Sequence, residues 1–280
     1  MTNGREDRVA DHSLRALQLV ELGILGAFVR LCEAHGLRYY LAYGTLLGAV
    51  RHQGFIPWDD DIDVTMPRRD YDRFAELCAS ELNSEHRWQS YSTDDDYPYL
   101  FGKFLKSATV LRQAAVAHLP FEQAVCIDVF PLDGRADRWW ATMIQRATIR
   151  VSRVRLEVSC KRTPTKRALA QLTRIFPRRV VIASLEAMTR AQPASRSGTS
   201  ICTGGPYGYR RQSFPSHWFG EGAPQIFEGL TVMGPSAWHE YLTQLYGDYM
   251  IPPPNVSRIS HHDVTEVRFG PRPNEATIER

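Results

Sequence analysis

An acidic run directly ahead of apolar strand residues constrains this chain more than any other feature. The run Pro57–Val64 reads Pro-Trp-Asp-Asp-Asp-Ile-Asp-Val. Alternate side chains on a strand share a face, so the run predicts one face for Asp59, Asp61 and Asp63. The opposite, buried face would carry Asp60, Ile62 and Val64. Carboxylates aligned this closely cannot all stay ionised without a cation.

Two further features accompany the acidic run. Gly44-Thr45 follows the short aromatic segment 38–43 and predicts a turn from a buried strand into a helix. Backbone amides at such a turn point at phosphate oxygens, with the positive end of the helix dipole behind them. Asp128 lies among the apolar residues of segment 126–130, where a charge needs a cation or a donor partner.

Hard oxygen ligands with open coordination positions favour Mg²⁺ shared with substrate phosphates, and Mn²⁺ is a possible substitute. Two other interpretations of the acidic run exist. A solvated acidic turn is the simpler one, but the apolar residues on the opposite face count against it. An EF-hand calcium loop requires glycine at its sixth position and glutamate at its twelfth, where the chain has Val64 and Asp70. The calcium loop is therefore rejected.

The hydrophobic pattern predicts an α/β organisation for residues 1–135, which we interpret as a catalytic core. A basic helical segment, 136–193, and a C-terminal lobe that completes the site, 194–272, would follow, with a frayed tail at 273–280. The expected helices are 13–33, one opening at 44, 68–80, 138–161, 166–191 and 236–246. The expected strands are 38–43, 62–66, 99–105, 109–113, 125–130 and short pieces near 214 and 225–233, with a loop at 194–208.

Composition limits the class of protein. The chain is 43% hydrophobic and 23% charged, which is typical of a globular protein, and it has no run of apolar residues long enough to span a bilayer. The N-terminus is polar and shows no secretory signal. Five scattered cysteines favour neither a disulfide framework nor a zinc site, so we expect a reduced, cytoplasmic protein.

Charge is distributed unevenly along the chain. Segment 145–179 has eleven basic residues and one acidic residue, a local charge of +10 in a chain whose net charge is +3. The segment lacks the interleaved aromatic residues of a nucleic-acid surface, so no nucleic acid is expected. Arg146, Arg150 and Arg153 share one helical face. They predict peripheral contact of 145–180 with the anionic inner face of the cell membrane, with a solvated face or an acceptor cleft as alternatives.

These motifs resemble the LicD family of bacterial phosphocholine and polyol-phosphate transferases, which is related to fukutin and fukutin-related protein. The resemblance rests first on 41–64, which includes Gly-Thr-Leu-Leu-Gly and Pro-Trp-Asp-Asp-Asp-Ile-Asp-Val. Shorter matches are Ile-Asp-Val-Phe-Pro-Leu-Asp-Gly at 127–134, Phe-Glu-Gly at 227–229, Tyr-Gly-Asp-Tyr-Met-Ile-Pro-Pro at 246–253 and His-His at 261–262. The matches span about residues 38 to 262, and segments 145–180 and 194–208 lie outside them.

The resemblance implies a nucleotidyltransferase-like mixed sheet with flanking helices, an α/β (α+β) fold. It also implies a Mg²⁺-dependent transferase that moves a phosphorylated alcohol from a CDP-linked donor to a cell-surface glycan or its lipid-linked precursor. In this interpretation Asp61 and Asp63 hold the metal, and Asp59 is either a further ligand or a residue that orients the ligands. Asp128 completes the metal site or accepts the proton of the acceptor hydroxyl. A nucleotidyltransferase acting on a small acceptor, and a non-catalytic glycan- or membrane-binding adaptor, are the alternatives.

Several cations are candidates for phosphate binding. Arg51 and His52 follow the Gly44 helix, where they could grip a diphosphate or simply interact with the helix dipole. Lys103 lies between two strand phenylalanines. The resemblance adds His261 and His262, as a general base or phosphate ligands. Glu228 is either a brace for the site or an ordinary turn residue.

Overall fold

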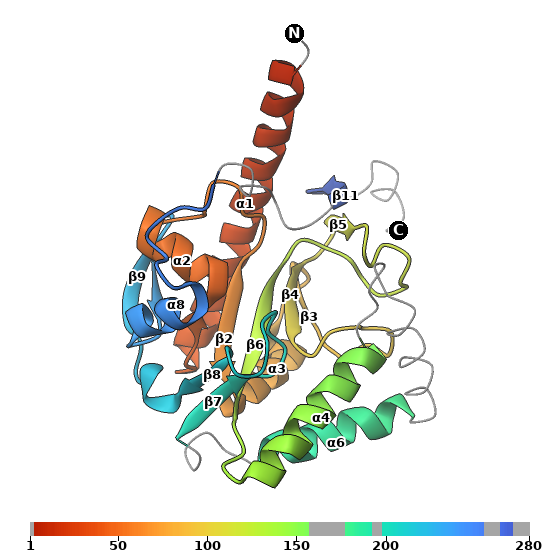
Figure 1. The fold of residues 1–280 in the computed structure, drawn as a ribbon. Coiled ribbons are helices and arrows are strands. Elements are labelled where there is room, and N and C mark those ends of the chain that lie inside the picture. The colour runs from red at the N-terminus through yellow and green to blue at the C-terminus, as the bar shows by residue number, and fades with distance from the viewer. Residues whose placement is uncertain (1–2, 157–176, 192–197, 255–263, 271–280) are drawn as a thin grey trace.

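The structure is a computed structural model of the chain, and it describes residues 3–156, 177–191, 198–254 and 264–270 (Figure 1). Its centre is a seven-stranded mixed sheet in the order β1-β2-β6-β4-β3, with β7 paired to β6 and β8 to β7. β2 and β6 run parallel, and the other pairs are antiparallel. The strands are β1 Tyr40–Leu41, β2 Asp63–Pro67, β3 His86–Gln89, β4 Gly102–Lys106, β6 Cys126–Gly134, β7 Thr199–Cys202 and β8 Ser213–Pro215.

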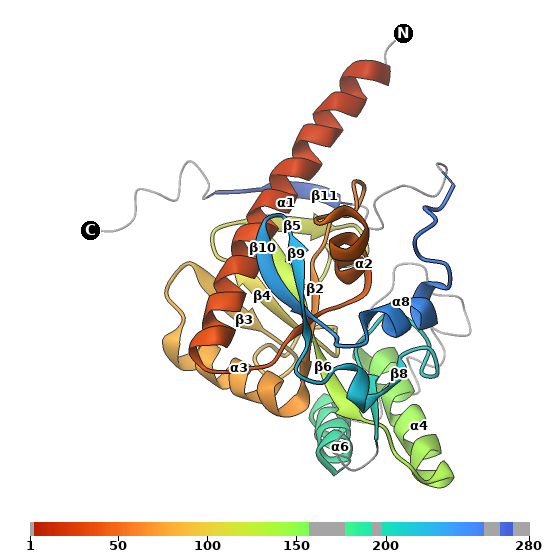
Figure 2. The same ribbon diagram turned by 90° about the vertical axis from the view of Figure 1, so that its left-hand side faces the viewer.

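Helices flank this sheet, and two small antiparallel strand pairs complete the fold (Figures 1 and 2). The helices are α1 Asn3–Ala34, α2 Tyr43–His52, α3 Arg68–Glu81, α4 Trp139–Leu156, α6 Arg178–Ala191 and α8 Trp238–Tyr246, with a short 3-10 helix η1 at Ser216–Trp218. The additional pairs are β9 Ala223–Phe227 with β10 Leu230–Gly234, and β5 Val110–Gln113 with β11 Val264–Arg268. The predicted α/β (α+β) class, with a mixed sheet and flanking helices, is confirmed.

The main core forms where α1 and α3 pack against the sheet. Phe28 of α1 lies 4.9 Å from the ring of Phe74 on α3, and Phe74 lies 5.6 Å from the ring of Phe104 on β4, measured between ring centroids. All three side chains are buried. Burial of one such aromatic ring stabilises the fold by roughly 1.5–3 kcal/mol. This packing fixes β2 and β6, the strands that carry Asp63 and Asp128.

The structure corrects several expected elements. Segment 194–208 is not a loop throughout, because β7 occupies Thr199–Cys202 and pairs with β6. The sequence pattern also missed β3 and β11, which are short and only partly buried. Within the expected helix 166–191, residues 178–191 form α6, and residues 166–176 lie outside the described part, as does the tail 273–280. No helix in the described ranges combines the length and the hydropathy that a bilayer span requires.

Candidate active site

Three charged side chains lie side by side across the middle of the sheet. Asp63 on β2 is the register partner of Asp128 on the parallel strand β6, and Asp128 is opposite Lys103 on β4. The Lys103 Nζ atom donates to the Asp128 Oδ1 atom at 2.5 Å. Burial alone would lower the pKa of Lys103, but Asp128 raises it well above the ordinary value. The predicted proximity of Asp63 and Asp128 is thus confirmed, and Asp128 has a donor partner.

The other aspartates converge in the turn ahead of β2. One carboxylate oxygen from each of Asp59, Asp60 and Asp61 lies within 4.8 Å of the others. The expectation that Asp60 faces away on a continuous strand is wrong, because β2 begins only at Asp63. The backbone of Asp59 is satisfied without strand pairing: its amide donates to the Ile56 carbonyl, and its carbonyl accepts from the Gln18 side chain.

Gly44 and Thr45 contribute to this arrangement in different ways. The Thr45 hydroxyl accepts a hydrogen bond from the Asp63 backbone amide at 2.8 Å, so it positions the start of β2. A Cβ atom on Gly44 would lie 2.7 Å from the Asp59 Oδ2 atom. Glycine is therefore required for the first turn of α2 to approach the acidic turn this closely. The first backbone amides of α2 have no hydrogen-bond acceptor within the helix, which is the property that the predicted phosphate site requires.

A cavity of about 650 Å³ opens on this cluster. Five of the predicted residues line it: Gly44, Arg51, Asp59, Asp61 and Asp63. The C-terminal lobe, which was expected to complete the site, also contributes to the lining through residues that were not predicted individually: Tyr207, Tyr246, Asp248 and Tyr249. The motif at 246–253 was the available signal, since it was matched to the family but given no role.

Of the predicted phosphate-binding cations that the structure describes, only Arg51 lines the cavity. Arg51 lines the cavity, and its Nη1 atom donates to the Tyr249 carbonyl at 3.0 Å. His52 lies outside the lining and accepts from the Arg51 Nε atom at 2.9 Å; partial burial and the charge of Arg51 lower its pKa. Lys103 pairs with Asp128, and His261 and His262 lie outside the described residues.

Glu21 on α1 is a functional candidate that the sequence interpretation missed. Its side chain is 1% exposed, and its Oε2 atom has no hydrogen-bond partner in the structure. Burial, and then the charges of Asp61 and Asp60, raise its pKa well above the ordinary value. An acid four residues from both Leu17 and Leu25, on the buried stripe of the helix, was the signal that could have found it.

Burial and like charges together shape the electrostatics of the cluster. Burial, followed by the charges of Asp61 and Asp128, raises the pKa of Asp63 well above its ordinary value, and Lys103 only partly opposes this effect. Hard carboxylate oxygens, mutual repulsion and an unpartnered buried Glu21 oxygen are together the environment that a divalent cation would neutralise. The residues present therefore fit a hard metal ion.

Glu228 braces the loop before the acidic run. Its Oε2 atom pairs with the Arg15 guanidinium of α1 at 2.7 Å, and its Oε1 atom accepts from the Phe55 amide at 3.3 Å. The Glu228 amide donates to the Gln53 carbonyl. The hydrogen bond from Arg15, and to a lesser extent the Phe55 amide, lowers the pKa of Glu228. Glu228 also lies in the turn between β9 and β10, with φ of 50°, so both interpretations of this residue agree with the structure, and a role in the active site stays a prediction.

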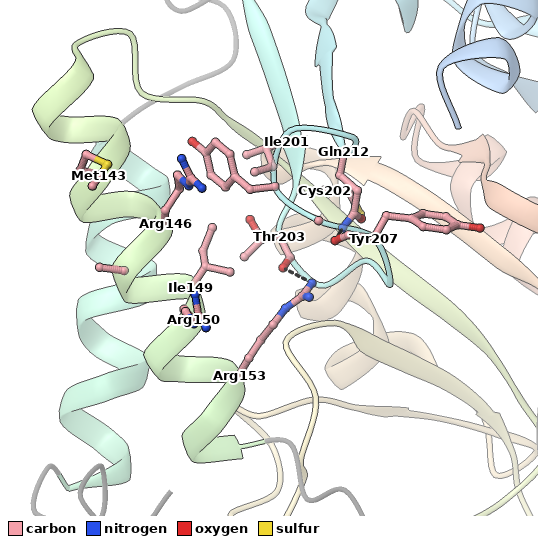
Figure 3. A pocket seen from close by; sticks show the side chains of 13 residues that line it. Met143, Arg146, Ile149, Arg150, Arg153, Ile201, Cys202, Thr203, Tyr207 and Gln212 are labelled. Atoms are coloured by element: carbon pink, nitrogen blue, oxygen red, sulfur yellow. Dashed lines mark hydrogen bonds between the residues drawn. The ribbon is translucent and has the colours of Figure 1, made fainter. Parts of the chain in front are cut away.

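Three arginines of the basic segment face a cavity, whereas the sequence predicted that they face a membrane. Arg146, Arg150 and Arg153 all line a second cavity, between α4 and the loop 203–212. Arg153 donates to the carbonyls of Thr203 and Gly205 in that loop. Figure 3 shows the side chain of Arg153 reaching from α4 to Thr203. Contact between 145–180 and a membrane stays a prediction.

Comparison with known proteins adds to this geometry. Residues 36–152 match the family model described as LicD/FKTN/FKRP, nucleotidyltransferase domain. The chain is 31% identical over 265 residues to the lipopolysaccharide cholinephosphotransferase LicD of Haemophilus influenzae, covering 89% of this chain and 96% of that protein. It is also similar to the ribitol 5-phosphate transferase FKRP of Homo sapiens and of Mus musculus, each 39% identical over 71 residues, which is 25% of this chain and 14% of theirs.

Proposed function

This chain belongs to the LicD family and is a transferase of substituted phosphate groups, and we propose that it moves phosphocholine or a polyol phosphate from a CDP-linked donor to a hydroxyl of a glycan or its lipid-linked precursor. Its relatives are a cholinephosphotransferase named for lipopolysaccharide and a ribitol 5-phosphate transferase. The observation that carries the proposal is the convergence of Asp59, Asp61 and Asp63 on one wall of a cavity of about 650 Å³.

Mg²⁺, or Mn²⁺ in its place, is the cofactor we propose for this site. Asp61 and Asp63 would hold the ion, with Asp59 and Asp128 as further ligands or supports. Asp60 and Glu21, which the structure adds to the cluster, would place two further carboxyl groups on its buried side. A metal bound there supplies positive charge against the donor's diphosphate and against the charge that develops on the leaving cytidine monophosphate.

The chain's own groups would do the remaining work. Arg51, held by the Tyr249 carbonyl, has a guanidinium at the cavity that can grip phosphate oxygens. The amides at the start of α2, beside Gly44, favour an anion through the helix dipole. Asp128 would accept the proton of the attacking hydroxyl, and the contact with Lys103 would hold the Asp128 side chain in position.

A donor-hydrolysis assay tests this function. The purified chain is incubated with MgCl₂ and a panel of CDP-linked alcohols, including CDP-choline and CDP-ribitol, and nucleotide products are separated. We expect slow release of cytidine monophosphate from one donor without any acceptor, and loss of that release in EDTA.

The products also separate the alternatives. A nucleotidyltransferase would instead release pyrophosphate from a nucleoside triphosphate when a small acceptor is present. A non-catalytic adaptor would release neither product and would bind no Mg²⁺ in calorimetry. Either result would overturn the proposed function.

Replacing Gly44 with alanine should weaken the metal site without unfolding the protein. The added Cβ would contact only the Asp59 carboxylate, the movable end of a side chain, so Asp59 is displaced from the cluster. Outer-shell changes of this kind typically cost about tenfold to a hundredfold in metal affinity. Isothermal titration with Mg²⁺ measures the effect.

Gly48→Ala is the matched control on the same helix. Its Cβ would lie 2.4 Å from the Gly54 carbonyl oxygen and 3.2 Å from the Ile56 amide nitrogen, both backbone atoms that cannot rotate away. We therefore expect Gly48→Ala to lower the free energy of unfolding, whereas Gly44→Ala should not. Unchanged Mg²⁺ affinity in Gly44→Ala would contradict the assignment of Asp59 to the metal site.

A further inference from the structure

A second cavity, of about 600 Å³, lies beside the proposed active site. α4 forms one wall, with Arg146, Arg150 and Arg153 at positions four and three residues apart, and the loop 203–212 forms the other (Figure 3). Among the residues that the structure describes, no carboxylate lines this cavity. Its surface therefore combines concentrated positive charge with an apolar floor.

The two cavities meet at one side chain. Tyr207 lines both of them, and its ring lies 5.9 Å from the ring of Tyr43, which lines the cavity at the aspartates. The Tyr43 hydroxyl donates to the Oε1 atom of Gln212, a residue of the second cavity, at 2.7 Å. A ligand that fills the second cavity would thus contact Tyr207, which also lines the cavity at the aspartates.

The three arginines have different surroundings. Arg153 holds the loop by donating to two of its carbonyls, so its role is partly structural. The Arg146 guanidinium lies over the Tyr209 ring at 5.5 Å from its centroid. Neither Arg146 nor Arg150 forms an ion pair with any residue in the described ranges, although like charges one turn apart repel each other. An anion between them would relieve that repulsion.

We propose that this cavity binds an anionic sugar unit of the acceptor glycan, through a phosphate or carboxylate held by Arg146 and Arg150. Guanidinium groups bind such oxyanions with paired, charge-assisted hydrogen bonds. The tyrosines and the apolar residues Ile149 and Ile201 supply the mostly apolar lining that is typical of ligand sites. The inference rests on the proposed function, because it takes the acceptor to be a glycan.

Binding is measured by calorimetry on the full chain in EDTA, so that the acidic cluster repels the probe and contributes no site. The probes are glucose 6-phosphate, glucuronate and neutral glucose. We expect at least one anionic sugar to bind, about tenfold or more tighter than glucose. The preferred probe identifies the anion as phosphate or carboxylate.

The variant Arg146→Gln/Arg150→Gln should weaken that binding by roughly tenfold per arginine. Arg153 is left in place, because its removal would release the loop. The matched control is Arg138→Gln/Arg179→Gln, which removes the same charge from two exposed positions of the same segment outside the cavity. Binding in the control should equal that of the parent.

Three results would overturn the proposal. The parent could show no preference for an anionic sugar over glucose, or the two double variants could lose sugar binding equally. The third is that Arg146→Gln/Arg150→Gln loses binding to anionic vesicles while its sugar binding is unchanged. The last result would assign these arginines to a membrane surface. The binding assay contains neither donor nor metal, and the proposed function is tested by cytidine monophosphate release from the parent protein. The sugar-binding proposal can therefore fail while the proposed function holds, and the reverse is also true.

Discussion

Replacing Asp63 with asparagine is expected to lower turnover by at least about a thousandfold, because a bound metal supplies several kcal/mol of charge stabilisation to a transferring phosphate and Asp63 is the proposed ligand that lies on the sheet. Asp63 lies at the start of β2, where the Thr45 hydroxyl holds its amide, and it faces the cavity beside Asp61. Asparagine keeps the shape of the side chain but removes its charge. Cytidine monophosphate release in the donor assay measures the loss.

Stability measurements distinguish this loss from misfolding. Mg²⁺ at a hundredfold excess over its Kd should stabilise the parent by about 2.7 kcal/mol, and Asp63→Asn should lose most of that effect. The control Asp70→Asn, which weakens a pair with the half-exposed Arg38 outside the cavity, should retain both Mg²⁺ stabilisation and turnover. Full turnover in Asp63→Asn would remove this residue from the mechanism.

The same substitution should change the pH dependence of the metal-free protein. Because the pKa of Asp63 is raised in the folded state, the folded chain binds more protons than the unfolded chain above the ordinary value of 3.8. The free energy of unfolding therefore falls as pH rises from that value through the raised pKa. Asp63→Asn lacks this contribution, so its stability in EDTA should fall less between pH 4 and pH 8.

Local patterns predicted the strands and turns that carry the site. Asp63 and Asp128 each interrupt an apolar run, and such runs form adjacent central strands here, in register as parallel partners. Gly44-Thr45 likewise marked the start of a helix next to that strand pair. These predictions needed only periodicity and the cost of burying a charge, both of which are properties of short segments.

Features that depend on tertiary packing were not predictable in the same way. Asp60 joins the cluster because the chain turns ahead of β2, where the Asp59 amide donates to the Ile56 carbonyl, and does not extend as a strand. Glu21 approaches the cluster only because α1 packs across β4 and β6. The tyrosine wall comes from residues 207–249, far along the chain. No local pattern indicates which distant segment closes a cavity.

The arginines of α4 show a similar limit. Their spacing correctly placed Arg146, Arg150 and Arg153 on one helical face. What that face contacts depends on the loop 203–212, which reaches α4 only because β7 adds to the end of β6. Since β7 falls in a segment rich in serine, glycine and threonine, its pairing was invisible to strand propensity, and an outer, membrane-facing surface was expected instead.

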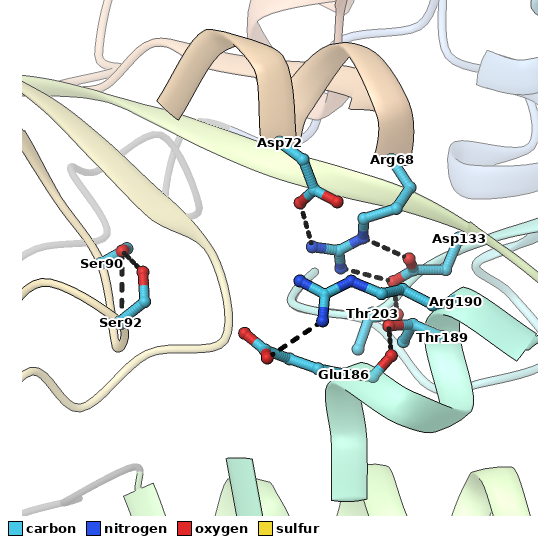
Figure 4. A network of polar contacts seen from close by, with 9 residues as sticks. All are labelled: Arg68, Asp72, Ser90, Ser92, Asp133, Glu186, Thr189, Arg190 and Thr203. Carbon is cyan, nitrogen blue, oxygen red and sulfur yellow. Dashed lines mark hydrogen bonds and ion pairs between the residues drawn. The ribbon is translucent and has the colours of Figure 1, made fainter. Parts of the chain in front are cut away.

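Replacing Asp133 with alanine is expected to destabilise the fold by about 3–5 kcal/mol, because it leaves a buried guanidinium without its partner. Asp133, at 0% exposure on β6, accepts from the Arg68 Nε atom at 2.7 Å and from its Nη2 atom at 3.0 Å (Figure 4). Burial would lower the pKa of Arg68, but Asp133 raises it well above the ordinary value. Chemical denaturation measures the change.

The control is Asp72, which contacts the other edge of the Arg68 guanidinium. Asp72 contacts the Arg68 Nη1 atom at 3.5 Å, but its side chain is 36% exposed, so Asp72→Ala should cost no more than about 1 kcal/mol. If Asp133→Ala does not fold at all, the double variant Arg68→Met/Asp133→Leu should recover much of the stability, since it leaves no unpaired buried charge. A cost for Asp133→Ala as small as that for Asp72→Ala would contradict the assignment.

This ion pair also connects stability to the second cavity. The Thr203 hydroxyl donates to Asp133, and the Thr203 carbonyl accepts from Arg153 at the cavity wall (Figure 4 shows Thr203 beside Asp133). Loss of Asp133 should therefore loosen the loop that carries Tyr207, in addition to destabilising the sheet. In a folded double variant Arg68→Met/Asp133→Leu, we expect weaker binding of the anionic sugar than in Asp72→Ala, because the loop loses the acceptor that orients Thr203.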